Sequence, residues 1–122
     1  MNKSTLYHNP RCSKSRQTLE LLKQNNVDVT IVEYLKTPPN AERIQEILSL
    51  LNFEPRQLMR KGEDAYRELS LDDESLNDEQ LITAMVSHPK LIERPILIVE
   101  DANHGSKAAV GRPPENVLTI IN

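Results

Sequence analysis

The single cysteine of the chain, Cys12, lies in the run from Tyr7 to Arg16, which reads Tyr-His-Asn-Pro-Arg-Cys-Ser-Lys-Ser-Arg. A strand-like run precedes it and a helical pattern begins at Ser13, so the sulfur is expected at a helix N-terminus. There the unpaired backbone N–H groups and the positive end of the helix dipole favour a thiolate and attract an anion. A lone cysteine is more commonly an inert core residue, but the cationic neighbours favour a reactive thiol.

Three arginines are candidates for binding an oxyanion, because guanidinium groups offer forked donors that match tetrahedral anions. Arg94 directly precedes Pro95 and an apolar run, and Arg112 follows Gly111 and precedes two prolines. Both are expected in turns at element ends, where functional groups collect. Arg60 has an alternative role, since a basic residue that closes a helix can simply complement the helix dipole.

Two polar side chains flank the cysteine within helical or turn spacing. His8 could tune the reactivity of Cys12 or merely shape the loop before it. Ser15 could hydrogen-bond the thiolate or simply fill the first helical turn. The residue types alone leave both alternatives open.

The length of 122 residues, with a mass of 13.9 kDa, predicts one domain over residues 1–122. The net charge is −3, and neither a basic stripe nor an aromatic platform for nucleic acid is visible. No apolar run approaches the roughly 20 residues of a membrane span, and the first residues lack a signal-peptide core. We therefore expect a cytoplasmic protein without nucleic-acid or membrane partners, which agrees with a single unpaired cysteine.

A metal site is not expected. His8, His88 and His104 are scattered, and the chain lacks the paired Cys or His spacing of zinc sites. We expect no bound cofactor either.

The first third of the chain predicts a β-α-β unit, with a strand at residues 5–7, a helix at about 13–25 and a strand at 29–35. Two such strands should lie parallel through a right-handed crossover. Cys12 then follows the carboxyl end of the first strand, which is the edge where open α/β sheets bind ligands.

A helical insertion is predicted over about residues 40–90. Its helices are expected at 40–52 with Asn40 as N-cap, at 54–61, at 64–69 and at 77–88. The continuous apolar run at 96–99 then predicts a central strand. A hairpin loop at 101–105, a strand at 107–110 and a last helix at about 114–121 complete the chain.

The order of elements, β-α-β, helices and β-β-α, resembles an α/β thioredoxin-like fold with a mixed four-stranded sheet. Five motifs narrow the resemblance: Tyr-His-Asn-Pro-x-Cys at 7–12, Tyr-Leu-x-Thr-Pro-Pro at 34–39, Leu-Met-Arg at 58–60, Glu-Arg-Pro-Ile at 93–96 and Gly-Arg-Pro-Pro-Glu at 111–115. Together they span essentially the whole chain, which resembles a short branch of the glutaredoxin-dependent, ArsC-like arsenate reductase family.

The resemblance assigns expected roles. Cys12 corresponds to the nucleophile, and Arg60, Arg94 and Arg112 correspond to the three anion-binding arginines of the family. His8 matches the histidine before the nucleophile, and Pro95 occupies the place of a cis-proline.

The implied reaction is reduction of arsenate by the thiolate through a covalent thioarsenate. Reduction takes two electrons, so a single thiol must join its sulfur to a second one. Because the chain has no other cysteine, this second sulfur must come from another molecule. The resemblance implies glutathione as co-substrate and a glutaredoxin as protein partner. A monomer is expected.

Three other functions are compatible with parts of this pattern. A phosphatase loop of the Cys-x5-Arg type is disfavoured, because the sixth residue after Cys12 is Thr18 and Arg16 comes too early. A non-enzymatic Spx-like regulator that binds RNA polymerase would typically carry Cys-x-x-Cys, whereas this chain has Ser15 at the second position. A reductase-like protein acting on another small oxyanion stays open.

Overall fold

The computed structural model describes residues 2–121, which form two compact units. The first unit comprises the chain up to Thr37 and again from Arg94 onward, and the second unit is Pro38–Glu93. Within residues 2–121, no helix is both long enough and apolar enough to cross a membrane.

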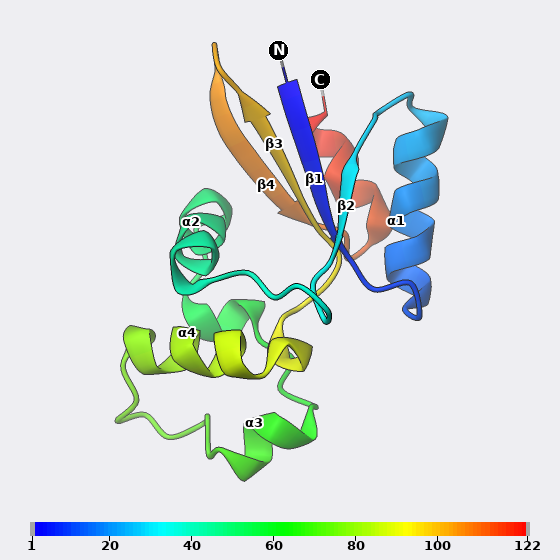
Figure 1. Cartoon of the computed structure of the whole chain (residues 1–122). Helices are drawn as coiled ribbons and strands as arrows, with labels where there is room; N and C mark the ends of the chain where they lie inside the picture. The colour runs from blue at the N-terminus through cyan, green and yellow to red at the C-terminus, as the bar shows by residue number, and fades with distance from the viewer. Residues whose placement is uncertain (1, 122) are drawn as a thin grey trace. The chain divides into compact units, whose positions relative to one another are not determined.

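The first unit is built on a four-stranded sheet with the strand order β2-β1-β3-β4 (Figure 1). Its strands are β1 (Asn2–His8), β2 (Thr30–Glu33), β3 (Ile96–Asp101) and β4 (Gly105–Val110). β1 pairs with β2 in parallel and with β3 antiparallel, and β3 pairs with β4 antiparallel. The predicted mixed four-stranded sheet is therefore confirmed.

The core of this unit lies between one face of the sheet and two helices, α1 (Ser13–Gln24) and η3 (Pro114–Ile120), which contact each other. Buried apolar side chains from both layers meet there: Leu6, Leu22, Leu97, Val99, Ala109 and Val117. A helix was predicted at about 114–121, and η3 forms there as a 3₁₀ helix. Pro114, Val117 and Ile120 recur every third residue, which matches the three residues per turn of a 3₁₀ helix.

The strand boundaries differ from the predicted ones for reasons of pairing. β1 is longer than predicted because it pairs with β3 from Asn2 to Tyr7. β2 ends early, at Glu33, because its carbonyl accepts the N–H groups of Lys36 and Thr37 in a turn. β4 begins at Gly105, which leaves a shorter hairpin loop than predicted.

The second unit is helical and contains α2 (Ala41–Leu51), η1 (Pro55–Leu58), α3 (Asp64–Glu68), α4 (Asp78–Ser87) and η2 (Pro89–Leu91). α2 begins as predicted, because the Asn40 side chain accepts the N–H of Arg43 at 2.8 Å. The segment predicted as a helix at 54–61 is a shorter 3₁₀ helix that ends at Leu58. The buried side chains of α2 and α4 recur with helical spacing: Ile44, Ile47, Leu48, Leu81, Ile82 and Met85.

Gly111 follows the end of β4 and packs closely against Pro95, which precedes β3. Its N–H donates to the Pro95 carbonyl at 2.9 Å. A Cβ on this residue would lie 2.5 Å from Thr18 Oγ1 and 2.8 Å from Pro95 Cγ. Only glycine therefore permits the close approach of this backbone to α1 and to Pro95.

We predict that Gly111→Ala lowers the free energy of unfolding by about 1–3 kcal/mol, because the added methyl group overpacks this contact. Urea denaturation measures the change, and Gly62→Ala is the matched control, since nothing lies within 4 Å of a Cβ there. Adding Thr18→Ala should recover part of the loss by removing the nearest atom. Equal stabilities for the two glycine variants would contradict the predicted overpacking.

Candidate functional site

Cys12 lies at the N-cap of α1, as predicted, and its side chain is partly exposed. Its backbone is extended (φ −93°, ψ 124°), and its N–H donates to the Asn9 carbonyl at 3.0 Å. The sulfur makes no capping hydrogen bond, and the first turn of α1 contains no acidic residue. The amide groups of this turn therefore keep their capacity to bind an anion beside the thiol.

Arg112 contacts the thiol directly. Its Nη2 group donates to Cys12 Sγ at 3.7 Å, and its Nε group donates to the Arg94 carbonyl at 2.9 Å. Two donors of one planar guanidinium are thus fixed at the same time, which sets the orientation of the plane. The structure brings Cys12 and Arg112 together across 100 residues of sequence.

Arg94 is partly buried and precedes Pro95 with a cis peptide bond, the geometry that the resemblance implies. The bond between Arg112 and Pro113 is also cis, which the sequence analysis did not predict. Because the Arg94 carbonyl accepts the hydrogen bond from Arg112 Nε, the Arg94 backbone supports Arg112 beside the sulfur.

Arg60 belongs to the second unit. It lies two residues beyond η1, which ends at Leu58, so Arg60 does not close a helix as the alternative role required. Its N–H donates to the Leu91 carbonyl at 2.7 Å. Its guanidinium lies 3.4 Å from a Glu63 oxygen and 3.6 Å from a Glu93 oxygen. Arg60 is therefore held by two carboxylates of its own unit.

His8 and Ser15 form a buried pair beneath the cysteine loop, with 6% and 0% of their surfaces exposed. His8 Nδ1 and Ser15 Oγ are 2.6 Å apart, and Ser15 Oγ also accepts the N–H of Asn9 at 3.0 Å. Because the hydroxyl oxygen accepts from the backbone, its proton can be donated to Nδ1 of a neutral imidazole. Ser15 thus links His8 to the loop that carries Cys12.

Burial lowers the pKa of His8 from its usual value near 6.5, because the protonated ring loses hydration. The positive charge of Arg16 lowers this pKa further, while Glu33 raises it. Glu33 is the register partner of His8 on β2. The lowered pKa keeps the imidazole neutral at pH 7, in agreement with its hydrogen bond to Ser15.

Asn9 is a residue of this site that the sequence analysis missed. Its carbonyl accepts the Cys12 N–H, and its side chain accepts the Arg11 N–H at 3.0 Å. The available signal was the Asn9-Pro10 dipeptide, which is typical of turns that begin with a side-chain hydrogen bond. Among residues 2–121, no three His, Cys, Asp or Glu side chains are grouped so that they could hold a metal ion.

The fold and this site define a thioredoxin-like α/β protein with a thiol and an arginine at one end of its sheet. The chain belongs to the ArsC family, whose model matches residues 7–120.

Named relatives support this assignment. The chain is 52% identical over 117 residues to the uncharacterized protein YfgD of Escherichia coli K12, covering 95% of this chain and 94% of that protein. It is 41% identical over 117 residues to an arsenate reductase of Neisseria meningitidis serogroup A, covering 95% and 96%. The solved structure of an arsenate reductase from Vibrio cholerae superposes with a TM-score of 0.88 at 44% identity, covering 98% of each chain.

We predict that acid destabilises the protein through His8. Because the folded pKa is lowered, protonation favours the unfolded chain, so stability should be level above about pH 6.5 and fall as the pH drops below it. Denaturant titrations between pH 5 and 7.5 measure this dependence.

The matched variant is His8→Asn, which keeps a polar side chain but does not titrate. Its loss of stability over the same pH range should be shallower than that of the wild type. An equally steep loss in both proteins would assign the effect to other groups.

Proposed function

We propose that this protein reduces arsenate to arsenite with Cys12 as the nucleophile. The observation that carries the proposal is the contact between Arg112 Nη2 and Cys12 Sγ, 3.7 Å long, at the open N-terminus of α1. A thiol, a forked cation and free helix amides together match the needs of a tetrahedral oxyanion that a thiolate attacks. The arsenate reductases among the relatives support the choice of arsenate.

In the proposed complex the oxyanion lies over the first turn of α1. The N–H groups of that turn donate hydrogen bonds to the oxyanion, and the Arg112 guanidinium holds oxygens beside the sulfur. Arg94 and Arg60 are assigned to the same anion by the family resemblance. Donors that hold developing negative charge in fixed positions lower the barrier of such a displacement.

The first step forms a bond between the Cys12 thiolate sulfur and arsenic, and one hydroxyl group of arsenate takes up a proton from solvent and leaves as water. Arsenic stays pentavalent in this thioarsenate. The thiolate of glutathione then attacks Cys12 Sγ, so that a sulfur–sulfur bond forms while the sulfur–arsenic bond breaks. The electron pair of the broken bond stays on arsenic, which leaves as trivalent arsenite.

The remaining product is a mixed disulfide between Cys12 and glutathione. Because the chain contains no second cysteine, this disulfide must be resolved from outside. A glutaredoxin thiolate attacks the glutathione sulfur and releases the Cys12 thiolate for another cycle. His8 and Ser15 act here as positioning residues, since their hydrogen bonds fix the loop from Asn9 to Cys12.

We predict that Cys12→Ser abolishes arsenate reduction and that Arg112→Ala lowers turnover on the order of a hundredfold, as loss of one oxyanion donor does. Arg112→Lys keeps the charge but not the fork, so it should recover only part of the activity. An assay with glutathione, glutaredoxin and coupled NADPH oxidation measures these rates.

The matched control is Arg67→Ala, because Arg67 is an exposed arginine of α3 whose one ion pair within residues 2–121 is with the exposed Asp64 carboxylate. This variant should be as active as the wild type. Full activity of Arg112→Ala would remove the anion role of Arg112, and full activity of Cys12→Ser would remove the nucleophile.

We also predict a glutathione adduct on Cys12 in protein trapped during turnover. Intact-mass spectrometry after acid quenching detects the adduct, and peptide mapping assigns it. Thioredoxin as the only reductant should support no turnover. Efficient turnover with thioredoxin and without glutathione would overturn the glutathione step while leaving Cys12 as nucleophile.

A further inference from the structure

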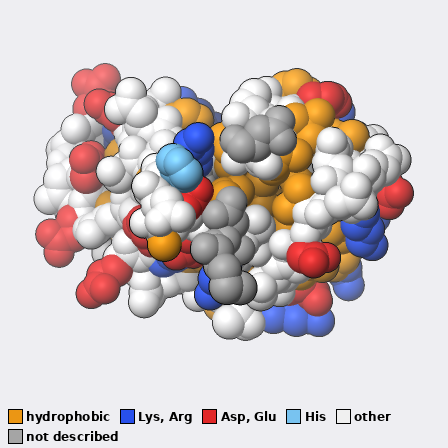
Figure 2. Space-filling model, turned by 90° about the horizontal axis from the view of Figure 1, so that it is seen from above, with side chains coloured by type: hydrophobic (Ala, Val, Ile, Leu, Met, Phe, Trp, Pro, Cys, Tyr) orange, Lys and Arg blue, Asp and Glu red, His pale blue; other side chains and the backbone are white. Residues whose placement is uncertain are grey.

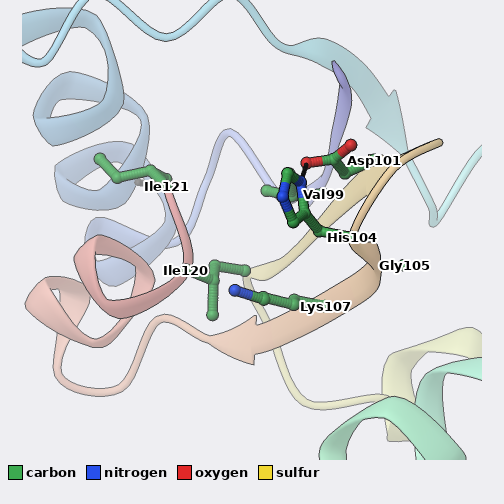
Figure 3. A pocket seen from close by; sticks show the side chains of 7 residues that line it. All are labelled: Val99, Asp101, His104, Gly105, Lys107, Ile120 and Ile121. Carbon is green, nitrogen blue, oxygen red and sulfur yellow. Dashed lines mark hydrogen bonds and ion pairs between the residues drawn. The ribbon is translucent and has the colours of Figure 1, made fainter. Parts of the chain in front are cut away.

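We propose that a second site, at the end of the sheet away from Cys12, binds a small amphipathic carboxylate. A cavity of about 250 Å³ lies there between the β3–β4 hairpin and the end of η3 (Figure 3). Its apolar lining comes from Val99, Ile120 and Ile121, and its charged or ionisable lining comes from Asp101, His104 and Lys107.

The register of the sheet explains why this cavity exists. Val99 pairs with Lys107 and Asp101 pairs with Gly105, on the same face as the core pair Leu97 and Ala109. Helices α1 and η3 cover the core part of this face, but η3 ends at Ile120. Gly105 contributes no side chain, so the last part of the face stays hollow.

The walls of the cavity suit an apolar group. Val99 is buried, and Ile120 and Ile121 are only partly buried as they pack against the core. Figure 2 looks onto this end of the molecule and shows hydrophobic side chains gathered at the surface, with basic and histidine side chains beside them. An apolar ligand group placed there would cover surface that the fold itself leaves exposed to water.

The charges favour a ligand that is an anion. The Asp101 carboxylate already accepts the Asn103 N–H at 2.8 Å and pairs with His104 Nδ1 at 2.8 Å. Lys107 extends from β4 toward Ile120 in Figure 3, and its ammonium forms no ion pair within residues 2–121. Hydrogen bonds therefore already engage the Asp101 carboxylate, and the Lys107 ammonium is the charged group left to pair with a ligand beside the apolar wall.

The size limits the ligand to a short chain or a single ring. Pockets for drug-sized ligands measure about 300–1,000 Å³, and this cavity is smaller. The site is also separate from Cys12. Asn2, at the start of β1, is the register partner of Asp101, and the cysteine loop follows His8 at the end of the same strand. The length of β1, about 20 Å, therefore separates the two sites.

Hexanoate is the test probe, titrated into uniformly ¹⁵N-labelled protein and followed by amide chemical shifts. We expect saturable shifts at residues 99–107 and 120–121, with a dissociation constant on the order of millimolar for so small a ligand. Hexan-1-ol should bind more weakly than hexanoate, and hexylamine should bind most weakly. Equal binding of hexylamine and hexanoate, or shifts that never saturate, would overturn the proposal.

Variants test the role of the cation. Lys107→Met should weaken hexanoate binding by about fivefold, the upper range for an exposed ion pair, while Lys107→Arg should retain it. Lys3→Met is the matched control. Lys3 is the register partner of Glu100 in the β1–β3 pairing, so it lies near the same end of the sheet but on its opposite face. Unchanged hexanoate affinity in Lys107→Met, or equal weakening in Lys3→Met, would contradict the assignment of Lys107.

Discussion

The site of this protein depends on the forked hydrogen bonding of Arg112. One guanidinium donates to the Arg94 carbonyl and to Cys12 Sγ, so it joins the segment after β4 to the segment before β3 and to the start of α1. A flexible single donor could reach one of these groups, but only a rigid plane fixes both at once. The backbone must come close for this to happen, and the hydrogen bond from Gly111 to Pro95 provides that approach.

Much of the fold could be predicted because its signals are local or strongly periodic. The continuous apolar run at Ile96–Val99 identified a buried strand, and Asn40 marked the start of α2 at the correct residue. Short helices were harder. A segment of four residues, such as η1, contains too few apolar positions to distinguish a period of 3.6 from one of 3.0.

The site was predictable in its residues but not in its contacts. The position of Cys12 follows from the local pattern of strand, turn and helix, which requires no knowledge of distant partners. Three contacts of the site could not be predicted in this way. They are the hydrogen bond between Arg112 and Cys12, the burial of Ser15 against His8, and the pairing of Arg60 with Glu63 and Glu93. They depend on side-chain rotamers and on packing between separate segments, which residue spacing does not encode.

The choice of cysteine at the N-cap of α1 has a consequence for the energetics of the whole unit. Serine, aspartate or asparagine would close the first turn with a side-chain oxygen, and that capping is worth about 1 kcal/mol to a helix. Cys12 provides no such bond, so α1 begins with backbone N–H groups that lack the hydrogen bond of a side-chain cap. An oxyanion bound there would itself become the missing cap. Binding of the oxyanion and stability of α1 are then thermodynamically coupled, so the free energy of unfolding rises when the site is filled.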